Sequence, residues 1–129
     1  MKILVIDDDA AMTDLLKLLL EPTSSTVLTA NDAAEGIGLV KELSPDIIIV
    51  DLMMPDMNGW EVCRIIRSLT QAPLIVLSAL NHPGMVARAL NAGADDYLTK
   101  PVTSKILLAY INKLVRRQNV EQGVSLRVV

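Results

Sequence analysis

The chain has 129 residues, of which 51% are hydrophobic and 21% charged, enough to bury the core of one soluble domain and unlike the composition of a disordered segment. The formal net charge of −3 gives no electrostatic reason to expect this chain itself to bind nucleic acid. The single cysteine, Cys63, excludes an intrachain disulfide and fits a reducing cytoplasm, and no apolar run reaches the roughly 20 residues of a membrane span.

The first half of the chain alternates short apolar runs with amphipathic stretches. Residues 2–6 predict a strand, and apolar positions spaced three and four apart over residues 10–20 predict a helix. Residues 25–30 predict a second strand, after which Asn31 or Asp32 can cap a second helix. The pattern so far is two strand–helix units.

The second half continues the same alternation. Residues 46–50 form the most apolar run of the chain and predict a buried third strand, which a long loop connects to a third helix. Residues 73–77 predict a fourth strand, followed by a helix with Gly93 as its C-cap. A short strand at residues 95–98 and a helix at residues 103–117 complete the pattern.

Five strand–helix units in succession predict an α/β fold, in which a five-stranded parallel sheet carries helices on both faces. Polar residues stand where the predicted strands end, at the edge of such a sheet where ligands bind. These residues are Asp7, Asp8, Asp51, Ser78 and Lys100.

This set of polar residues indicates a particular chemistry. Three converging carboxylates repel one another, and Mg²⁺, which prefers oxygen ligands, relieves that repulsion. A carboxylate can also attack phosphorus to give an aspartyl phosphate. Lys100 can supply a second positive contact, and the Ser78 hydroxyl can donate to a phosphoryl oxygen.

Residues 1–118 resemble the receiver domains of two-component response regulators, especially those of winged-helix transcription factors. Four motifs carry the resemblance in the family's order, and they are ILVIDDD, DLMMPDMNG, LSA and GADDYLTKP. The resemblance implies a flavodoxin-like (βα)5 fold with strand order 2-1-3-4-5. It also implies a phosphorelay switch that takes its phosphoryl group from a sensor histidine kinase.

The resemblance implies a role for each motif residue. Asp51 is the phosphoacceptor, Lys100 contacts the phosphoryl group, and Ser78 and Tyr97 form the conformational switch. The peptide bond between Lys100 and Pro101 is cis. Mg²⁺ has four protein ligands, which are the carboxylates of Asp7, Asp8 and Asp51 and the backbone carbonyl of Met53.

Two departures from the family pattern lead to further predictions. Relatives pair through charges across helix four, strand five and helix five, whereas Val86, Ile106 and Tyr110 stand at those places here, so we expect a homodimer with an apolar contact. Positions that influence hydrolysis in this family hold Met53 and Leu80. Neither side chain can orient a water, so we predict slow loss of the phosphoryl group.

Residues 119–129 are interpreted as a linker or the start of an effector domain, or as the end of a single-domain regulator that acts by contact. The alternation of Val124, Leu126 and Val128 suits a strand.

The sequence also leaves other functions to be weighed against this one. A phosphorylation-independent docking module would show loss of an acidic ligand or of Lys100, and neither is lost. A flavodoxin-like cofactor binder would need a Gly/Ser/Thr-rich loop after its first strand, where this chain has three aspartates. A Mg²⁺-dependent phosphohydrolase would place its nucleophile after strand one.

Several other conspicuous residues are interpreted as structural. Asp9 is expected to cap the first helix, and Asp56 is expected only to stabilise a turn. His82 is expected to lie in a loop without a functional role. Cys63 is expected to be a buried thiol and Trp60 a packing residue.

Overall fold

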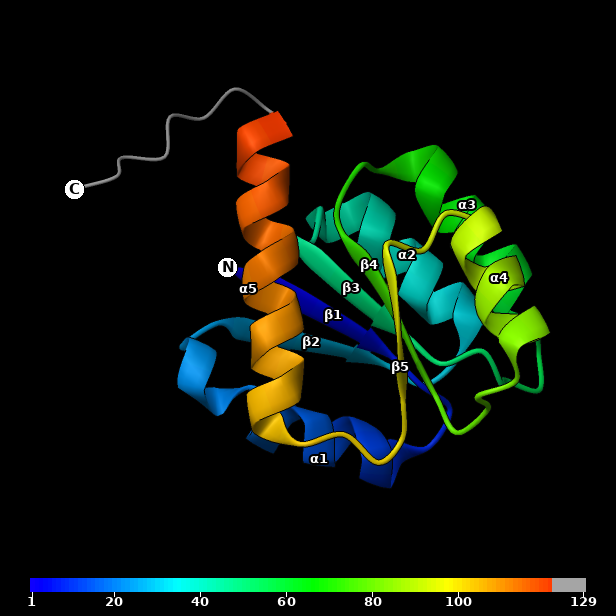
Figure 1. The fold of residues 1–129 in the computed structure, drawn as a ribbon, viewed down its shortest axis with the longest axis horizontal. Coiled ribbons are helices and arrows are strands. Elements are labelled where there is room, and N and C mark those ends of the chain that lie inside the picture. Colours follow the sequence, from blue (N-terminus) through cyan, green and yellow to red (C-terminus); the bar gives the residue numbers. More distant parts are fainter. Residues whose placement is uncertain (122–129) are drawn as a thin grey trace.

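The computed structural model describes residues 1–121. Five parallel strands form one sheet in the order β2-β1-β3-β4-β5, which confirms the expected topology (Figure 1). The strands are β1 (Lys2–Ile6), β2 (Thr26–Ala30), β3 (Ile47–Val50), β4 (Leu74–Ser78) and β5 (Asp96–Thr99). The helices are α1 (Ala10–Leu19), the 3₁₀ helix η1 (Glu21–Thr23), α2 (Ala33–Leu43), α3 (Gly59–Leu69), α4 (Pro83–Asn91) and α5 (Ser104–Glu121).

Helices cover both faces of the sheet, because successive strand residues point to opposite sides (Figure 1). Leu4 and Ile6 of β1 join the core beneath α2, α3 and α4. Ile3 and Val5 join a second core beneath α1 and α5. β3 and β4 are buried at every position, as expected for central strands covered on both faces.

Side-chain caps fix where the helices begin. The Asp9 carboxylate accepts hydrogen bonds from the Ala11 and Met12 amides, which confirms it as the cap of α1. Of the two candidates for α2, the structure selects Asp32. His82, for which no role was expected, caps α4 by accepting a hydrogen bond from the Gly84 amide through Nδ1.

Some boundaries differ from the sequence expectation. The first helix ends at Leu19, and Pro22 lies in η1, a short element that hydrophobic periodicity does not reveal. Gly93 has φ +116° and directly follows the C-cap residue of α4, which confirms its role in ending the helix. α5 continues to Glu121 because no Pro or Gly interrupts residues 104–121.

Cys63 is fully buried and Trp60 packs against the core, as expected. No helix among residues 1–121 is long and apolar enough to cross a bilayer. The predicted strand at Val124, Leu126 and Val128 lies outside the described residues.

Candidate functional site

Three acidic side chains meet at the carboxyl edge of the sheet. Asp7 and Asp8 directly follow β1, and Asp51 directly follows β3. These strands are hydrogen-bonded neighbours, and their last residues, Ile6 and Val50, are in register. The parallel pairing therefore brings the acidic residues together, and one oxygen from each carboxylate lies within 4.8 Å of the others.

Lys100 reaches this acidic cluster from the outermost strand, β5, along the same carboxyl edge of the sheet. It follows β5, and its Nζ lies 2.7 Å from Asp7 Oδ2 and 3.0 Å from Asp51 Oδ2. The side chains of Lys100, Asp7 and Asp51 are 15%, 3% and 10% exposed, so the two ion pairs are largely shielded from water. The single positive charge of Lys100 thus compensates only one of the two negative charges of Asp7 and Asp51.

The surroundings shift the pKa values of Asp7 and Lys100. Burial raises the pKa of Asp7 above its usual value, while hydrogen bonds from Lys100 and the Asp9 amide oppose that rise. Burial alone would lower the pKa of Lys100, but its hydrogen bonds and attraction to Asp7 and Asp51 outweigh burial and raise it. Lys100 is therefore firmly charged, and one ammonium does not neutralise the acidic cluster.

Backbone amides hold the two buried carboxylates in place. The Asp9 amide donates to Asp7 Oδ1 at 3.0 Å, and the Met53 amide donates to Asp51 Oδ1 at 3.1 Å. The sheet fixes the main chain at both positions, since the Asp7 amide donates to the Ala30 carbonyl at 3.0 Å and the Asp51 amide donates to the Ile6 carbonyl at 2.9 Å. Each aspartate thus presents its second oxygen, Oδ2, to Lys100.

The donor set fits a hard divalent cation. Three carboxylates that converge at one edge offer only oxygen, which is the ligand type that Mg²⁺ prefers. Asp8 is exposed while Asp7 and Asp51 are buried, so the cluster opens to solvent on the Asp8 side. The Met53 amide, bound to the Asp51 carboxylate, keeps its peptide unit next to the cluster.

Ser78 and Tyr97 lie beside the acidic cluster on neighbouring strands. Ser78 is fully buried at the end of β4, and its hydroxyl accepts a hydrogen bond from the Leu80 amide at 3.2 Å. The Tyr97 hydroxyl donates to the Leu80 carbonyl. Burial raises the pKa of Tyr97, the neighbouring Ser78 side chain opposes this rise, and the Asp51 charge adds to it.

The Tyr97 ring therefore points toward the β4–α4 loop and the acidic edge, which joins the two predicted switch residues through Leu80. The Lys100 amide donates to the Ser78 carbonyl at 2.9 Å, so the segment after β5 is tied to the end of β4. The next peptide bond, between Lys100 and Pro101, is cis.

The interpretation of Asp56 as a turn residue alone is wrong. Its Oδ2 accepts a hydrogen bond from the Ala33 amide at 3.0 Å, across 23 residues of sequence, at the start of α2. A sequence pattern for turns contains no signal for this contact, because the partner is a backbone amide whose position depends on tertiary packing.

Sequence reasoning also missed the contacts of two arginines. The Arg88 guanidinium of α4 lies 3.9 Å from the ring centroid of Trp60 on α3. Arg67 donates to the Gly93 carbonyl and to Asp95 Oδ2 at 2.8 Å. These contacts fix the helices next to β4 and β5 without touching the acidic cluster.

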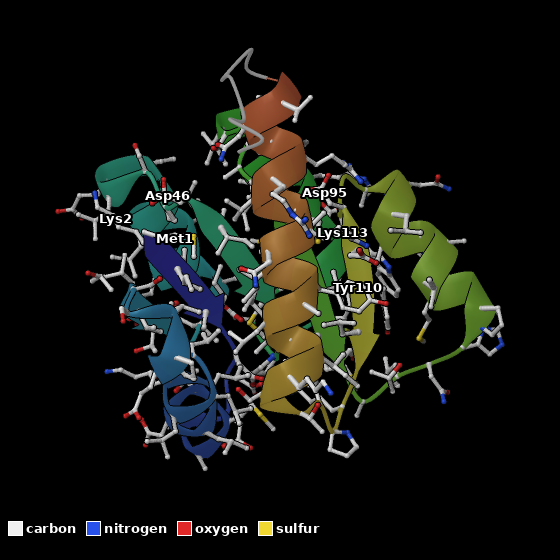
Figure 2. All side chains as sticks on the ribbon, turned by 60° about the vertical axis from the view of Figure 1, so that its left-hand side comes forward. Met1, Lys2, Asp46, Asp95, Tyr110 and Lys113 are labelled. Atoms are coloured by element: carbon white, nitrogen blue, oxygen red, sulfur yellow. The ribbon has the colours of Figure 1, made fainter. Side chains whose placement is uncertain are left out.

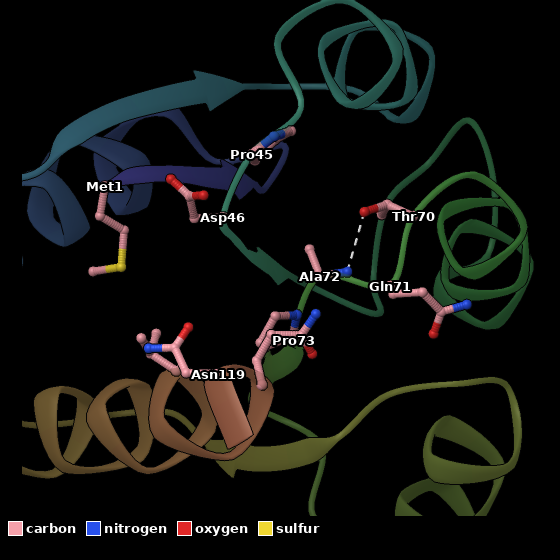
Figure 3. A pocket seen from close by; sticks show the side chains of 10 residues that line it. Met1, Pro45, Asp46, Thr70, Gln71, Ala72, Pro73 and Asn119 are labelled. Atoms are coloured by element: carbon pink, nitrogen blue, oxygen red, sulfur yellow. Dashed lines mark hydrogen bonds between the residues drawn. The ribbon is translucent and has the colours of Figure 1, made fainter. Parts of the chain in front are cut away.

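Among the hollows of the described residues, two lie at opposite edges of the sheet. A groove of about 680 Å³ adjoins the acidic edge and is lined mainly by the β3–α3 loop, Trp60, Leu80 and Met85. A pocket of about 430 Å³ lies at the opposite, amino edge, and Met1, Asp46 and Asn119 are among the residues that line it (Figure 3). The second pocket holds none of the predicted site residues.

Comparison with known proteins identifies the relatives of this arrangement. Residues 3–112 match the sequence profile of the response regulator receiver domain. The DNA-binding response regulator MtrA of Mycobacterium tuberculosis is 35% identical over 127 residues, which cover 98% of this chain and 56% of MtrA. The transcriptional regulatory protein AfsQ1 of Streptomyces coelicolor is 42% identical over 115 residues, covering 89% of this chain and 51% of AfsQ1. The chain thus spans about half the length of these relatives.

Solved structures give the same relationship. A two-component response regulator from Clostridium difficile superposes with a TM-score of 0.88 at 35% identity, covering 92% of this chain and 98% of that one. A CheY-like receiver domain protein from Methanospirillum hungatei superposes with a TM-score of 0.88 at 31% identity, covering 93% and 97%.

Proposed function

Because this chain belongs to the response regulator receiver family, we propose that Asp51 is the residue that accepts the phosphoryl group. As a receiver domain of the two-component systems, the chain is a signalling switch. The observation that carries the proposal is the contact of Lys100 Nζ with both Asp7 and Asp51 at the carboxyl edge of the sheet. A docking module that never uses phosphate is not favoured, because every acidic residue and Lys100 are present and adjacent.

The proposed reaction is a transfer between a histidine and an aspartate. An Asp51 carboxylate oxygen forms a bond to phosphorus, the nitrogen–phosphorus bond of the phosphohistidine breaks, and the leaving imidazole takes up a proton. The Met53 amide holds Oδ1, which fixes the orientation of the carboxylate. Lys100 contacts Oδ2 and lies within reach of the charge that the phosphoryl group brings.

We propose that Asp7, Asp8, Asp51 and the Met53 carbonyl hold Mg²⁺. The cation, when bound, neutralises phosphoryl and carboxylate oxygens that would otherwise repel one another. This proposal rests on the excess of carboxylates over the single ammonium of Lys100 in a largely buried cluster.

Ser78 and Tyr97 are proposed to transmit the effect of Asp51 phosphorylation to the rest of the domain. The Ser78 hydroxyl is a donor close to Asp51, at the end of the neighbouring strand. Phosphorylation adds nearly two negative charges, so we expect this hydroxyl to turn toward the phosphoryl group and weaken its bond from the Leu80 amide. Tyr97 contacts the same loop, which couples the acidic edge to α4 and β5.

We also propose partners and a location. A sensor histidine kinase supplies the phosphoryl group, and residues beyond 118 lead to an effector, as in the longer relatives that are named DNA-binding regulators. No nucleic acid is expected to bind this receiver segment, whose charge is slightly negative. A cytoplasmic location agrees with the lone buried thiol of Cys63.

A homodimer is proposed to form through α4, β5 and α5, with an apolar contact. Ile106 is 48% exposed on α5, one helical turn before the partly buried Tyr110, and Val86 on α4 is partly buried as well. Lys113 already pairs with Asp96 at 2.7 Å within the chain and covers the Tyr110 ring (Figure 2). A charge-paired contact is therefore disfavoured at this place.

Light scattering with and without acetyl phosphate tests this surface. The phosphorylated native chain should dimerise, Ile106→Lys should stay monomeric, and Leu18→Lys on α1, which is 62% exposed, should dimerise normally. A native chain that stays monomeric when fully phosphorylated would rule the surface out.

The experiment that tests the function is phosphorus NMR after incubation with acetyl phosphate. The proposal predicts one new signal that requires Mg²⁺ and disappears with hydroxylamine, which cleaves acyl phosphates. The signal should persist well beyond seconds, because Met53 and Leu80 offer no side-chain hydrogen bond to an attacking water. No Mg²⁺-dependent signal from folded protein would contradict the proposal.

A further inference from the structure

The loop that follows Asp51 connects β3 to α3, with Leu52 and Met54 buried in the core and Met57 packed against it. Its other side chains are exposed. Met53, the proposed ligand through its carbonyl, is 56% exposed, and Pro55 and Asp56 are exposed as well. Exposed segments with few packing contacts sample many conformations, and binding a ligand then includes the cost of ordering them. The contacts that restrain this loop therefore matter for the site that it forms.

The two ends of the loop are fixed by their own neighbours. The Met53 amide donates to Asp51 Oδ1 at 3.1 Å at the start of the loop. At its end, the Gly59 amide donates to the Leu52 carbonyl at 3.0 Å, and Asn58 caps α3 through the Glu61 amide at 2.9 Å. Between these ends Met54 is held by its burial in the core, whereas the exposed residues Pro55 and Asp56 need a further restraint to be fixed.

Asp56 supplies that restraint. Its Oδ2 accepts from the Ala33 amide at 3.0 Å, the first residue of α2. Ala33 is fully buried in the core, so α2 is a firm anchor at this point. The bond ties the middle of the loop, three residues after Met53, to a helix that is packed against the sheet.

Asp32 provides a comparison within the same structure. It also caps α2, accepting from the Glu35 amide at 2.7 Å, but it directly precedes the helix and does not belong to the loop. Two carboxylates thus satisfy two free amides at one helix end. Only the Asp56 contact joins that end to the loop after Asp51.

From this difference we infer that Asp56 is a positioning residue for the phosphoacceptor site, which anchors the β3–α3 loop to α2 and thereby preorganises the loop for Mg²⁺ binding. The inference rests on the proposed function, because it concerns the same metal site. Asp56 touches neither the acidic cluster nor Lys100 in the structure, and it acts through the backbone of its loop.

Three variants separate anchoring from other effects. Asp56→Ala removes the accepting oxygen, Asp56→Asn keeps a neutral accepting oxygen, and Asp32→Ala weakens α2 without touching the loop. Mg²⁺ affinity is measured for the full chain by calorimetry and by Trp60 fluorescence, since Trp60 lines the same groove as the loop. Thermal unfolding confirms that each variant is folded.

Asp56→Ala should bind Mg²⁺ about fivefold more weakly, the size of effect expected from one lost capping bond. Asp56→Asn should remain within about twofold of the native chain, because it restores the bond without the charge. Asp32→Ala should lose a few degrees of melting temperature, about as much as Asp56→Ala, with unchanged Mg²⁺ affinity.

Three results would overturn the inference. Native affinity in Asp56→Ala would show that the anchor is irrelevant to the metal site. Equal weakening in Asp56→Asn would assign the effect to charge, and equal weakening in Asp32→Ala would assign it to the stability of α2. If the native chain itself bound no Mg²⁺, the proposed function would fail instead, so the two failures are distinguishable.

Discussion

At the scale of single residues, Lys100 forms two largely buried ion pairs, with Asp7 and with Asp51. Its ammonium contacts two carboxylates that are almost out of reach of water. The sequence placed Lys100, Asp7 and Asp51 at strand ends, and the shared edge of a parallel sheet explains why they meet. Their hydrogen-bond pattern could not be predicted, because it depends on side-chain rotamers rather than on strand order.

Replacing Lys100 with alanine should destabilise the fold. The change leaves two buried carboxylates without a partner, so the free energy of unfolding should fall by about 3 kcal/mol in the absence of Mg²⁺. Added Mg²⁺ should restore part of the loss by binding the folded state. Urea denaturation with and without Mg²⁺ measures both effects.

A matched control for this variant is Lys113→Ala. The Lys113 side chain is half exposed in its ion pair with Asp96, and such pairs contribute about 0–1 kcal/mol.

Acidification should reduce the loss in free energy of unfolding that Lys100→Ala causes. The pKa of Asp7 is already raised by burial, so its unpaired charge is relieved by protonation as pH falls through that pKa. Equal losses in the two variants would contradict the account of Lys100.

At the scale of elements, local signals predicted the strands and most helix starts. Asp9 and Asp32 act as caps because their side chains accept hydrogen bonds from amides two or three residues ahead. Such a contact can be predicted from the local sequence alone. Contacts between elements were not predicted. The Asp56–Ala33 hydrogen bond and the Arg88–Trp60 contact join residues on different elements. Whether such residues come close in space depends on how the elements pack.

Two glycines of α2 test the packing of this helix. An added Cβ on Gly38 meets nothing within 4 Å, whereas one on Gly36 would lie 2.6 Å from Ile6 Cδ1 and 2.8 Å from its Cγ1. Gly38→Ala should therefore stabilise the protein by about 0.5–1 kcal/mol through helix propensity. Gly36→Ala should destabilise it by roughly 1–3 kcal/mol, because Ile6 is fully buried and cannot move aside freely.

Thermal unfolding of the two variants measures these effects against the native chain. The pair is informative because the residues occupy the same helix and receive the same added methyl group. Stabilisation by both substitutions would mean that α2 is not packed against Ile6 as the structure has it.

At the scale of the whole molecule, the alternation of strands and helices predicted the fold class, and the resemblance supplied the strand order that the structure confirms. Chain order alone left that strand order open, since a parallel sheet can be assembled in several ways. The acidic edge follows from this order. The chain passes from β2 across β1 to β3, so β1 and β3 become neighbours and the aspartates that follow them lie side by side.

The proposed switch depends on the uptake of one phosphoryl group by Asp51 with the help of Mg²⁺. Intact-mass spectrometry after incubation with acetyl phosphate measures this uptake on the native chain, Asp51→Ala and the control Asp14→Ala on α1. We expect a gain of about 80 Da, one phosphoryl group, in the native and control chains with Mg²⁺ and in neither without it. An equal gain in folded Asp51→Ala, or no gain in a native chain shown to bind Mg²⁺, would show that Asp51 is not the phosphoacceptor.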